Sequence, residues 1–201
     1  MQTVYQQILR AIIQTSIWEW FAVATAIFYV ILAAKRLILC WLFALISSAL
    51  YVYICFISKL YIETFLQVFY FGMGVLGWIL WNKSSAENNE IKTWGIRLNL
   101  INIILSGILT FGLGYYFKLN TNQASPFLDA FVTSFALSAT LMITKKVHEG
   151  WAYFIVVDLV SIYLYASREL YLSSFLSIVY TILAIFGWLA WLKAMKKQSM
   201  L

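Results

Sequence analysis

An apolar stretch of the chain, residues 151–166, carries one acid and several aromatic residues at helical spacing. Asp158 lies near its middle, and Trp151 and Phe154 fall on the same helical face. A carboxylate in an apolar helix is costly unless a cation, hydrogen-bond donors or water accompany it, and aromatic rings also attract cations. We therefore expect a bound cation opposite Asp158. The alternative is a protonated or water-solvated structural aspartate.

A second polar group lies in the apolar stretch 60–81, where Gln67 and Tyr70 are one helical turn apart. An amide in such a helix needs a partner, so it either contacts a ligand or bonds to a neighbouring helix. Tyr180 and Trp188, in the last apolar stretch, are further aromatic candidates on one helical face.

The chain contains an internal repeat. Residues 66–81 read LQVFYFGMGVLGWILW, and residues 176–191 read LSIVYTILAIFGWLAW. The same register pairs Glu19 with Asp129 near the start of each copy. Repeated units of this length in an apolar chain are typical of transporters. The copies differ at two polar positions, where Gln67 corresponds to Ser177 and Ser48 corresponds to Asp158. We expect the substrate to bind near such unshared residues.

The composition, with 63% hydrophobic residues, 11% charged residues and one proline, indicates an integral membrane protein. A bilayer core of about 30 Å needs roughly 20 apolar residues per helix. Seven segments fit, which predicts an all-α membrane protein with seven transmembrane helices. They are Trp18–Ala34, Leu37–Ile57, Leu60–Trp81, Leu98–Phe117, Phe127–Thr144, Trp151–Ala166 and Leu170–Leu192.

The predicted helices form a 3+1+3 arrangement. Each repeat crosses the membrane three times, and the single helix between them gives both repeats the same orientation, as in SWEET-like parallel repeats. The predicted parts are an interfacial segment 1–17, which includes Tyr5, Ile8, Leu9, Ile12 and Ile13, a first repeat 18–81, a loop and linker helix 82–126 with the helix at 98–117, a second repeat 127–192 and a basic tail 193–201.

The basic residues predict the orientation. If the segments alternate, one side of the membrane receives ten of the fourteen lysine and arginine residues. The positive-inside rule makes that side cytoplasmic, so the N-terminus is outside and the C-terminus is inside. The net charge of +6 is explained in this way, and we expect no nucleic-acid partner. The ten are Lys35, Arg36, Lys83, Lys92, Arg97, Lys145, Lys146, Lys193, Lys196 and Lys197.

The remaining motifs predict neither a catalytic centre nor a cofactor or metal site. Cys40 and Cys55 belong to no metal-type cluster, and no HExxH, GxSxG or P-loop motif occurs. His148 lies in a loop beside Glu149. A membrane-embedded hydrolase or lipid-modifying enzyme is the disfavoured alternative. Most tryptophans are expected in an interfacial belt, namely Trp18, Trp20, Trp41, Trp81, Trp94 and Trp191.

Two runs of sequence resemble the PnuC-type bacterial vitamin transporters. They are LYIETFLQVFYFGMGVLGWILW at 60–81 and LDAFVTSFALSATLMITKKVHEGW at 128–151. The resemblance implies uptake of nicotinamide riboside, an NAD precursor, across the bacterial inner membrane. It further implies a homotrimer, and facilitated diffusion with trapping by cytoplasmic phosphorylation. Another vitamin such as thiamine, with or without ion coupling, is the alternative.

The same resemblance implies a set of substrate contacts. In nicotinamide riboside members the sixth helix reads WxxW followed by an asparagine, with the aromatics around the pyridinium ring. Trp151 matches the first tryptophan here, while Phe154 and Asp158 replace the second tryptophan and the asparagine. We expect the two three-helix halves to rock around a site between the third, sixth and seventh helices. The predicted contacts are Gln67, Tyr70, Trp151, Phe154, Asp158, Tyr180 and Trp188.

Overall fold

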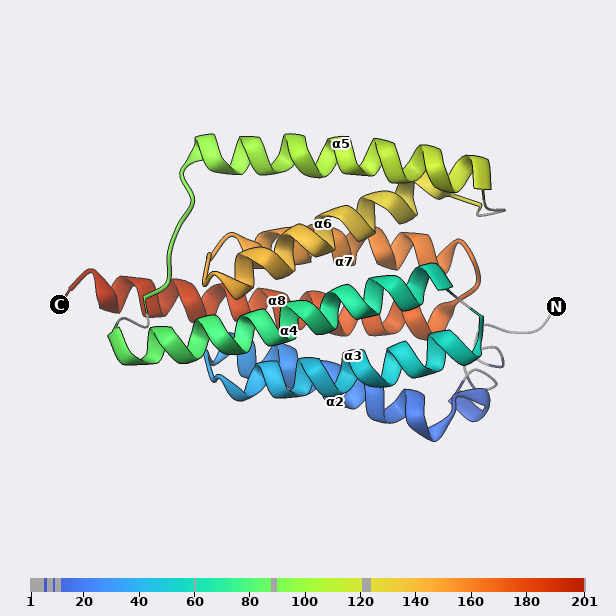
Figure 1. Ribbon diagram of the computed structural model, residues 1–201, viewed down its shortest axis with the longest axis horizontal. Helices are drawn as coiled ribbons and strands as arrows, with labels where there is room; N and C mark the ends of the chain where they lie inside the picture. The colour runs from blue at the N-terminus through green and yellow to red at the C-terminus, as the bar shows by residue number, and fades with distance from the viewer. Residues whose placement is uncertain are drawn as a thin grey trace. The chain divides into compact units, whose positions relative to one another are not determined.

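The structure is a computed structural model that describes Gln6, Leu9 and residues 12–59, 61–87, 90–120 and 124–200. Apart from an isolated bridge between Lys92 and Val147, the regular elements within these residues are helices (Figure 1). Each of the seven predicted segments coincides with one helix. They are α2 (Ile17–Ala34), α3 (Leu39–Ile57), α4 (Tyr61–Glu87), α5 (Ile96–Asn120), α6 (Pro126–Thr144), α7 (Gly150–Ala166) and α8 (Tyr171–Gln198).

Six stretches within the described residues are long and apolar enough to cross a membrane, which confirms the prediction of an all-helical integral membrane protein. Helix α7, with 17 residues, is a shorter apolar helix. Several helices extend past their predicted ends, because polar residues continue a helix beyond the apolar run. Helix α8 thus includes Lys193, Lys196 and Lys197 of the predicted tail.

The N-terminal segment is described only in part. Gln6, Leu9 and the residues from Ile12 to Gln14 are helical, whereas Tyr5 and Ile8 of the predicted interfacial helix lie outside the described residues. Helix α2 then begins with a capping box. The Ser16 amide donates to the Glu19 carboxylate at 2.7 Å, and the Glu19 amide donates to the Ser16 hydroxyl at 3.2 Å. These reciprocal bonds fix the start of α2.

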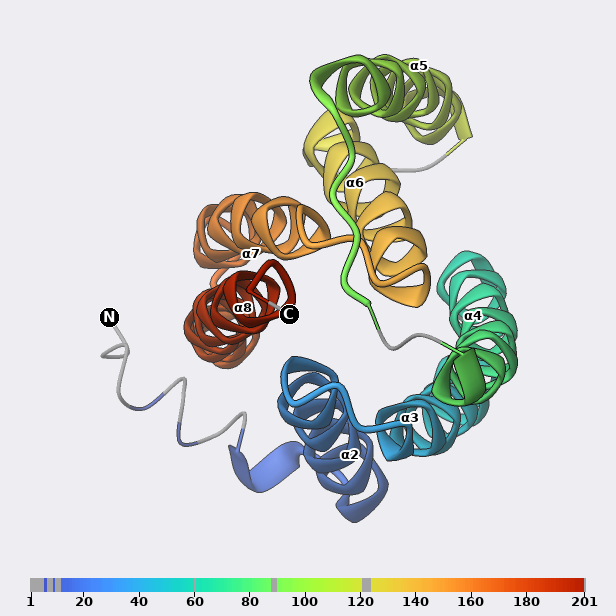
Figure 2. The ribbon, with the colours of Figure 1, turned by 90° about the vertical axis from the view of Figure 1, so that its left-hand side faces the viewer.

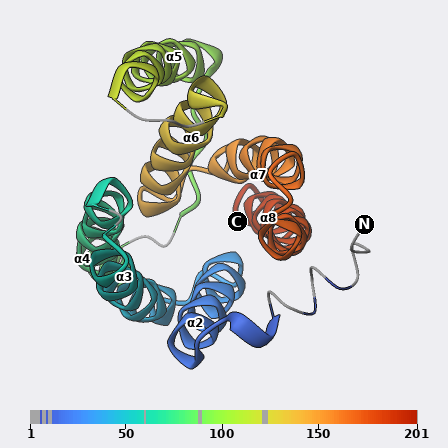
Figure 3. The same cartoon turned by 90° about the vertical axis from the view of Figure 1, so that its right-hand side faces the viewer.

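The chain divides into two compact units. Unit 1 comprises Met1–Glu90 and Leu189–Leu201, and unit 2 comprises Ile91–Trp188. In unit 1, α3 packs against both α2 and α4 (Figure 2). In unit 2, α6 packs against both α5 and α7 (Figure 3). The first part of α8 joins α7 there, where the Ser174 hydroxyl donates to the Ile162 carbonyl at 3.0 Å.

Helix α5 is fastened to α6 by polar and small residues. The Asn102 amide donates to the Ser138 hydroxyl at 2.6 Å, and that hydroxyl lies 2.9 Å from the Asn102 carbonyl oxygen. Further along, the Phe127 ring lies directly over Gly114, where a Cβ atom would collide with it. The remaining surface of α5 is strongly apolar and exposed, as expected for a helix that faces lipid.

The turns that end α2 and α6 occupy equivalent positions of the repeat and have the same hydrogen bonds. The Leu37 amide donates to the Leu32 carbonyl at 3.0 Å, and the Val147 amide donates to the Met142 carbonyl at 2.8 Å. Each turn contains a basic residue with positive φ, 59° at Arg36 in the first and 56° at Lys146 in the second. These bonds are those of a Schellman motif, which closes a helix C-terminus.

The next turn of each copy shows the same correspondence. Lys59, after α3, has a φ of 59°, and Glu169, after α7, has a φ of 60°. The Lys59 amide donates to the Phe56 carbonyl at 3.0 Å, and the Glu169 amide donates to the Ala166 carbonyl at 3.1 Å. Every positive-φ residue in the described part of the chain therefore has its counterpart at the equivalent position of the other copy.

A glycine and a tryptophan pack together at matching places in the two units. The Trp41 ring of α3 lies against Gly77 of α4, and the Trp151 ring of α7 lies against Gly187 of α8. In both pairs a Cβ atom on the glycine would overlap the indole ring. The glycines therefore allow close approach of neighbouring helices.

The tryptophan belt was predicted too broadly. Trp41, Trp81 and Trp191 are 1%, 3% and 0% exposed, so they belong to the protein interior. Trp81 packs edge-on against Trp41, with 5.4 Å between the ring centroids. The Trp191 indole nitrogen donates to the Ala33 carbonyl at 3.1 Å. Trp18 and Trp20 are exposed, as the belt prediction requires. Composition alone does not separate a lipid-facing indole from one that finds an acceptor inside the protein.

Alanine at Gly77 or Gly187 is expected to destabilise the protein, because the new methyl group would overlap the adjoining tryptophan ring. Overpacking of this kind lowers the unfolding free energy by about 1–3 kcal/mol. Gly72→Ala and Gly107→Ala are matched controls, since a Cβ atom there meets nothing within 4 Å, and they should gain up to about 1 kcal/mol from helix propensity. Thermal unfolding in detergent compares the four variants. If Gly77→Ala and Gly187→Ala melted at the same temperature as the two controls, the Trp41 and Trp151 rings would be able to move aside.

Candidate functional site

Helix α7 has one exposed face and one face turned into the protein. Val156, Leu159 and Tyr163 are exposed by 49%, 53% and 67%. The face predicted to carry Trp151, Phe154 and Asp158 lies on the opposite side, where Trp151 and Ser161 are buried, and Phe154, Asp158 and Tyr165 are half-buried. The residues predicted from helical spacing therefore lie on the protected face of α7. Functional polar groups of membrane proteins usually lie on such protected faces and not toward lipid.

Asp158 is a half-buried carboxylate on that protected face. Within the described part of the chain it has no hydrogen bond or ion pair. Ser161, on the same face, donates its hydroxyl to the Val157 carbonyl at 2.9 Å and is satisfied within its own helix. The Asp158 carboxylate is thus a charged group on this face whose partner must be supplied by water, a proton or a ligand.

Trp151 and Phe154 begin the same face. Their ring centroids are 6.4 Å apart with planes inclined at 52°, so the structure brings these two predicted contacts together. Trp151 is only 2% exposed and its ring covers Gly187, which gives it a packing role. Phe154 is half-buried and lies one turn before Asp158. A ring and a carboxylate at this spacing can meet the same small cation.

Gln67 and Tyr70 lie on α4, in unit 1. Both are half-buried, and they share a helical face with the buried Gly74. The opposite face is exposed, at 76% for Phe65 and 51% for Val68. Gln67 has no hydrogen bond within the described residues, so its amide is available for a polar ligand. The other five predicted contacts belong to unit 2.

Tyr180 and Trp188 lie on α8 and are both half-buried. Trp188 packs against His148, whose ring centroid is 3.9 Å away. The sequence predicts a loop at His148 and assigns this residue no role. The useful sequence signal was the repeat itself, because the position equivalent to His148 is Ile38, so that a polar residue replaces an apolar one.

The segment before α5 is bound to the turn between α6 and α7. The Lys92 amide donates to the Lys146 carbonyl at 2.8 Å, and the His148 amide donates to the Lys92 carbonyl at 2.9 Å. The Glu149 carboxylate accepts the Trp94 amide at 2.9 Å. These three bonds give the α6–α7 turn of unit 2 a fixed place against the linker.

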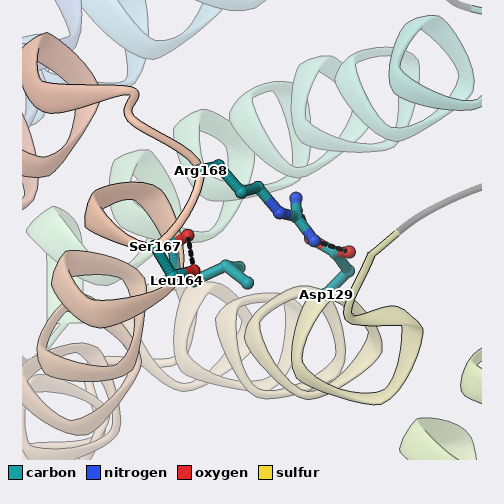
Figure 4. A network of polar contacts seen from close by, with 4 residues as sticks. All are labelled: Asp129, Leu164, Ser167 and Arg168. Carbon is teal, nitrogen blue, oxygen red and sulfur yellow. Dashed lines mark hydrogen bonds and ion pairs between the residues drawn. The ribbon is translucent and has the colours of Figure 1, made fainter. Parts of the chain in front are cut away.

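An ion pair joins the first turn of α6 to the turn between α7 and α8 (Figure 4). Arg168 binds both carboxylate oxygens of Asp129, with Nη1–Oδ1 at 2.9 Å and Nη2–Oδ2 at 2.6 Å. The side chains are 24% and 17% exposed, respectively. The hydrogen bond to Asp129 raises the pKa of Arg168 above its usual value, so the guanidinium stays charged at physiological pH.

The sequence does not reveal this pair, because Asp129 lies in one predicted helix, Arg168 lies in the turn between two others, and the two residues are far apart along the chain. The Ser167 hydroxyl donates to the Leu164 carbonyl at 2.8 Å and helps to close the same turn (Figure 4).

Within the described residues, His, Cys, Asp and Glu side chains form no cluster of three or more that could hold a metal ion.

Comparison with known proteins gives a consistent set of relatives. A family model described as nicotinamide mononucleotide transporter matches residues 16–193. The nicotinamide riboside transporter PnuC of Escherichia coli is 23% identical over 84% of this chain and 82% of its own length. The protein of the same name from Neisseria mucosa is 27% identical over 89% of this chain and 73% of its own length.

The fold has a solved counterpart as well. The crystal structure of the vitamin B3 transporter PnuC is similar to this chain with a TM-score of 0.74 and 25% sequence identity. The similarity covers 96% of this chain and 88% of the other. The described helices therefore follow a known membrane-protein fold over almost their whole extent.

Arg168→Ala is expected to lower the unfolding free energy by about 1–3 kcal/mol, because it leaves the Asp129 carboxylate without its two charge-assisted bonds. Arg168→Lys should fall between alanine and the wild type, since it keeps the charge and loses the planar fork. Lys118→Ala, which removes an exposed cation, is the control. Thermal unfolding in detergent measures the series. If lysine and alanine destabilised equally, bidentate geometry would be the whole contribution and charge would contribute nothing.

Proposed function

Because the chain belongs to the nicotinamide mononucleotide transporter family, we propose that it takes up nicotinamide riboside across a bacterial cell membrane. The observation that carries the proposal is the unpaired Asp158 carboxylate on the protected face of α7, one turn from Phe154. Nicotinamide riboside is a cation with a flat aromatic ring. A carboxylate and an aromatic face are the groups that such a ring binds.

We assign the cargo contacts from side-chain chemistry and from the resemblance to the family. Asp158 balances the positive charge of the pyridinium ring. Phe154, Tyr180 and Trp188 offer aromatic surface, with the Trp151 ring packed beside Phe154. A separate pair, on α4 of unit 1, offers an amide and a hydroxyl, which are groups that hydrogen-bond to ribose hydroxyls and a carboxamide. That pair is Gln67 and Tyr70.

The proposed architecture is seven transmembrane helices in a 3+1+3 arrangement of parallel repeats, with α5 as the linker. The matching turns at Arg36 and Lys146 support it, as do the matching contacts of Gly77 and Gly187. Helix α7, with 17 residues, is at the lower end of the range of about 17 to 25 residues for a span. The distribution of basic residues supports an outside N-terminus and a cytoplasmic C-terminus.

The transport mode that we propose is facilitated diffusion, with phosphorylation in the cytoplasm trapping the cargo, in a homotrimer. These three properties come from the family resemblance. One observation favours a second candidate, which is another cationic vitamin such as thiamine. Asp158 takes the place of the family's asparagine, and a carboxylate attracts any small organic cation. A carboxylate that binds protons would also suit ion-coupled transport.

Purified protein in liposomes is expected to take up labelled nicotinamide riboside down its gradient, and to do so without a proton or sodium gradient. Thiamine and riboflavin, tested in the same vesicles, separate the second candidate from the first. Uptake that needs an ion gradient would replace facilitated diffusion by coupled transport. Flux of none of the three vitamins would contradict the transporter proposal.

Asp158→Asn is expected to weaken binding of nicotinamide riboside by about tenfold, since it removes roughly 1.4 kcal/mol of charge attraction. Reduced nicotinamide riboside is a matched neutral probe of almost the same shape, and its affinity should stay the same. Asp158→Glu is the control variant because it keeps the charge. Titration calorimetry on purified protein gives the affinities. Unchanged affinities for both probes would remove Asp158 from the site.

A further inference from the structure

His148 makes two contacts with a single residue of α8. Its ring centroid lies 3.9 Å from that of Trp188, with planes inclined at 43°, and its Nε2 lies 3.1 Å from the Trp188 carbonyl oxygen. A carbonyl oxygen only accepts, so Nε2 carries the proton and donates. His148 is 4% exposed. A buried histidine that contacts both the ring and the backbone of one residue fixes that residue in place.

The main chain of His148 is held on both sides. Its amide donates to the Lys92 carbonyl at 2.9 Å, and its carbonyl accepts the Trp151 amide at 3.2 Å. The next residue, Glu149, accepts the Trp94 amide at 2.9 Å. The imidazole therefore projects from a turn that is tied to the start of α7 and to the linker before α5, and not from a free loop.

The neighbouring residue on α8 is fixed at the same level. Gly187 lies against the Trp151 ring, so the close helix contact and the His148 contact act on consecutive residues. Together they set the rotation of α8 about its own axis at this point and the direction of the Trp188 side chain. Trp188 is half-buried, so the ring held by His148 retains surface that a ligand can cover.

The first copy of the repeat has no histidine at the position equivalent to His148. In the repeat, Gly187 corresponds to Gly77 and Trp188 to Trp78, while His148 corresponds to Ile38. The glycine contact is present in both units, but an isoleucine side chain cannot donate a hydrogen bond. Trp78 is 36% exposed. The histidine is thus an addition to shared packing, and it occurs in the unit that also contains Asp158.

We propose that His148 is a positioning residue, which holds the Trp188 indole in the orientation that binds the cargo. The inference rests on the proposed function, because it takes nicotinamide riboside as the cargo. His148 acts through Trp188, so its effect on affinity exists only while the indole is present. The shared Gly–Trp contact supplies packing, and His148 adds the orientation of one aromatic surface.

The test uses three His148 variants and a matched control. His148→Ala removes both contacts and should weaken nicotinamide riboside binding by about tenfold, from one hydrogen bond and one ring contact. His148→Gln keeps a donor without the ring, and His148→Phe keeps a ring without the donor. The affinity of both variants should therefore lie between those of the wild type and His148→Ala. Ile38→Ala is the control at the equivalent position and should leave the affinity unchanged. Calorimetry on folded, purified protein gives the affinities, and thermal unfolding is followed in parallel.

A double-mutant cycle with Trp188→Phe separates positioning from general support of the fold. In the Trp188→Phe background, His148→Ala should cause little further loss of affinity, since the indole through which it acts is gone. Additive losses would overturn the inference, as would unchanged affinity in all three His148 variants. If His148→Ala fails to fold, the glutamine and phenylalanine variants decide the same question. Absence of binding by the wild-type protein would overturn the proposed function, and this inference with it.

Discussion

Close contact between a tryptophan ring and a glycine backbone sets how closely α3 meets α4 in unit 1 and α7 meets α8 in unit 2. Trp41 lies against Gly77 in unit 1, and Trp151 lies against Gly187 in unit 2. In a bilayer the apolar side chains gain little from leaving lipid, so helix association depends on packing and on hydrogen bonds. A large flat ring on a helix surface without a Cβ atom maximises that packing. The burial of the Trp151 ring at the start of α7 follows from this contact.

Short turns then have to return the chain without leaving backbone groups unsatisfied at the membrane boundary. Four residues in the described part of the chain adopt positive φ for this purpose, and three of them, Arg36, Lys59 and Lys146, are basic. Glycine would adopt this conformation with less strain. A basic residue compensates in part, because it lies at a helix C-terminus, where the helix dipole favours a cation.

The helices and the protected face of α7 could be predicted from sequence, because both depend on local hydrophobic periodicity. The positions of Trp41, Trp81 and Trp191 could not, since lipid and protein interior are both apolar and hydropathy does not separate them. The same limit applies to Asp129 with Arg168, and to His148 with Trp188. Each pair joins residues far apart in the sequence, and only the packed fold brings them into contact. The predicted cargo contacts follow chemistry and resemblance, and they remain predictions.

The two copies differ in how they satisfy their polar groups. Ser48 donates to the Ala44 carbonyl at 2.8 Å within its own helix, whereas the equivalent Asp158 has no partner in the described part of the chain. Glu19 caps its own helix, whereas the equivalent Asp129 binds Arg168 across unit 2. Ile38 is apolar, whereas the equivalent His148 bonds to α8. Local satisfaction costs a membrane protein little, while long-range pairs and an unpaired carboxylate require a reason. Holding the residues that bind a cation is one function that can require them. The Asp129–Arg168 pair, the His148–Trp188 pair and the unpaired Asp158 carboxylate all belong to the second copy.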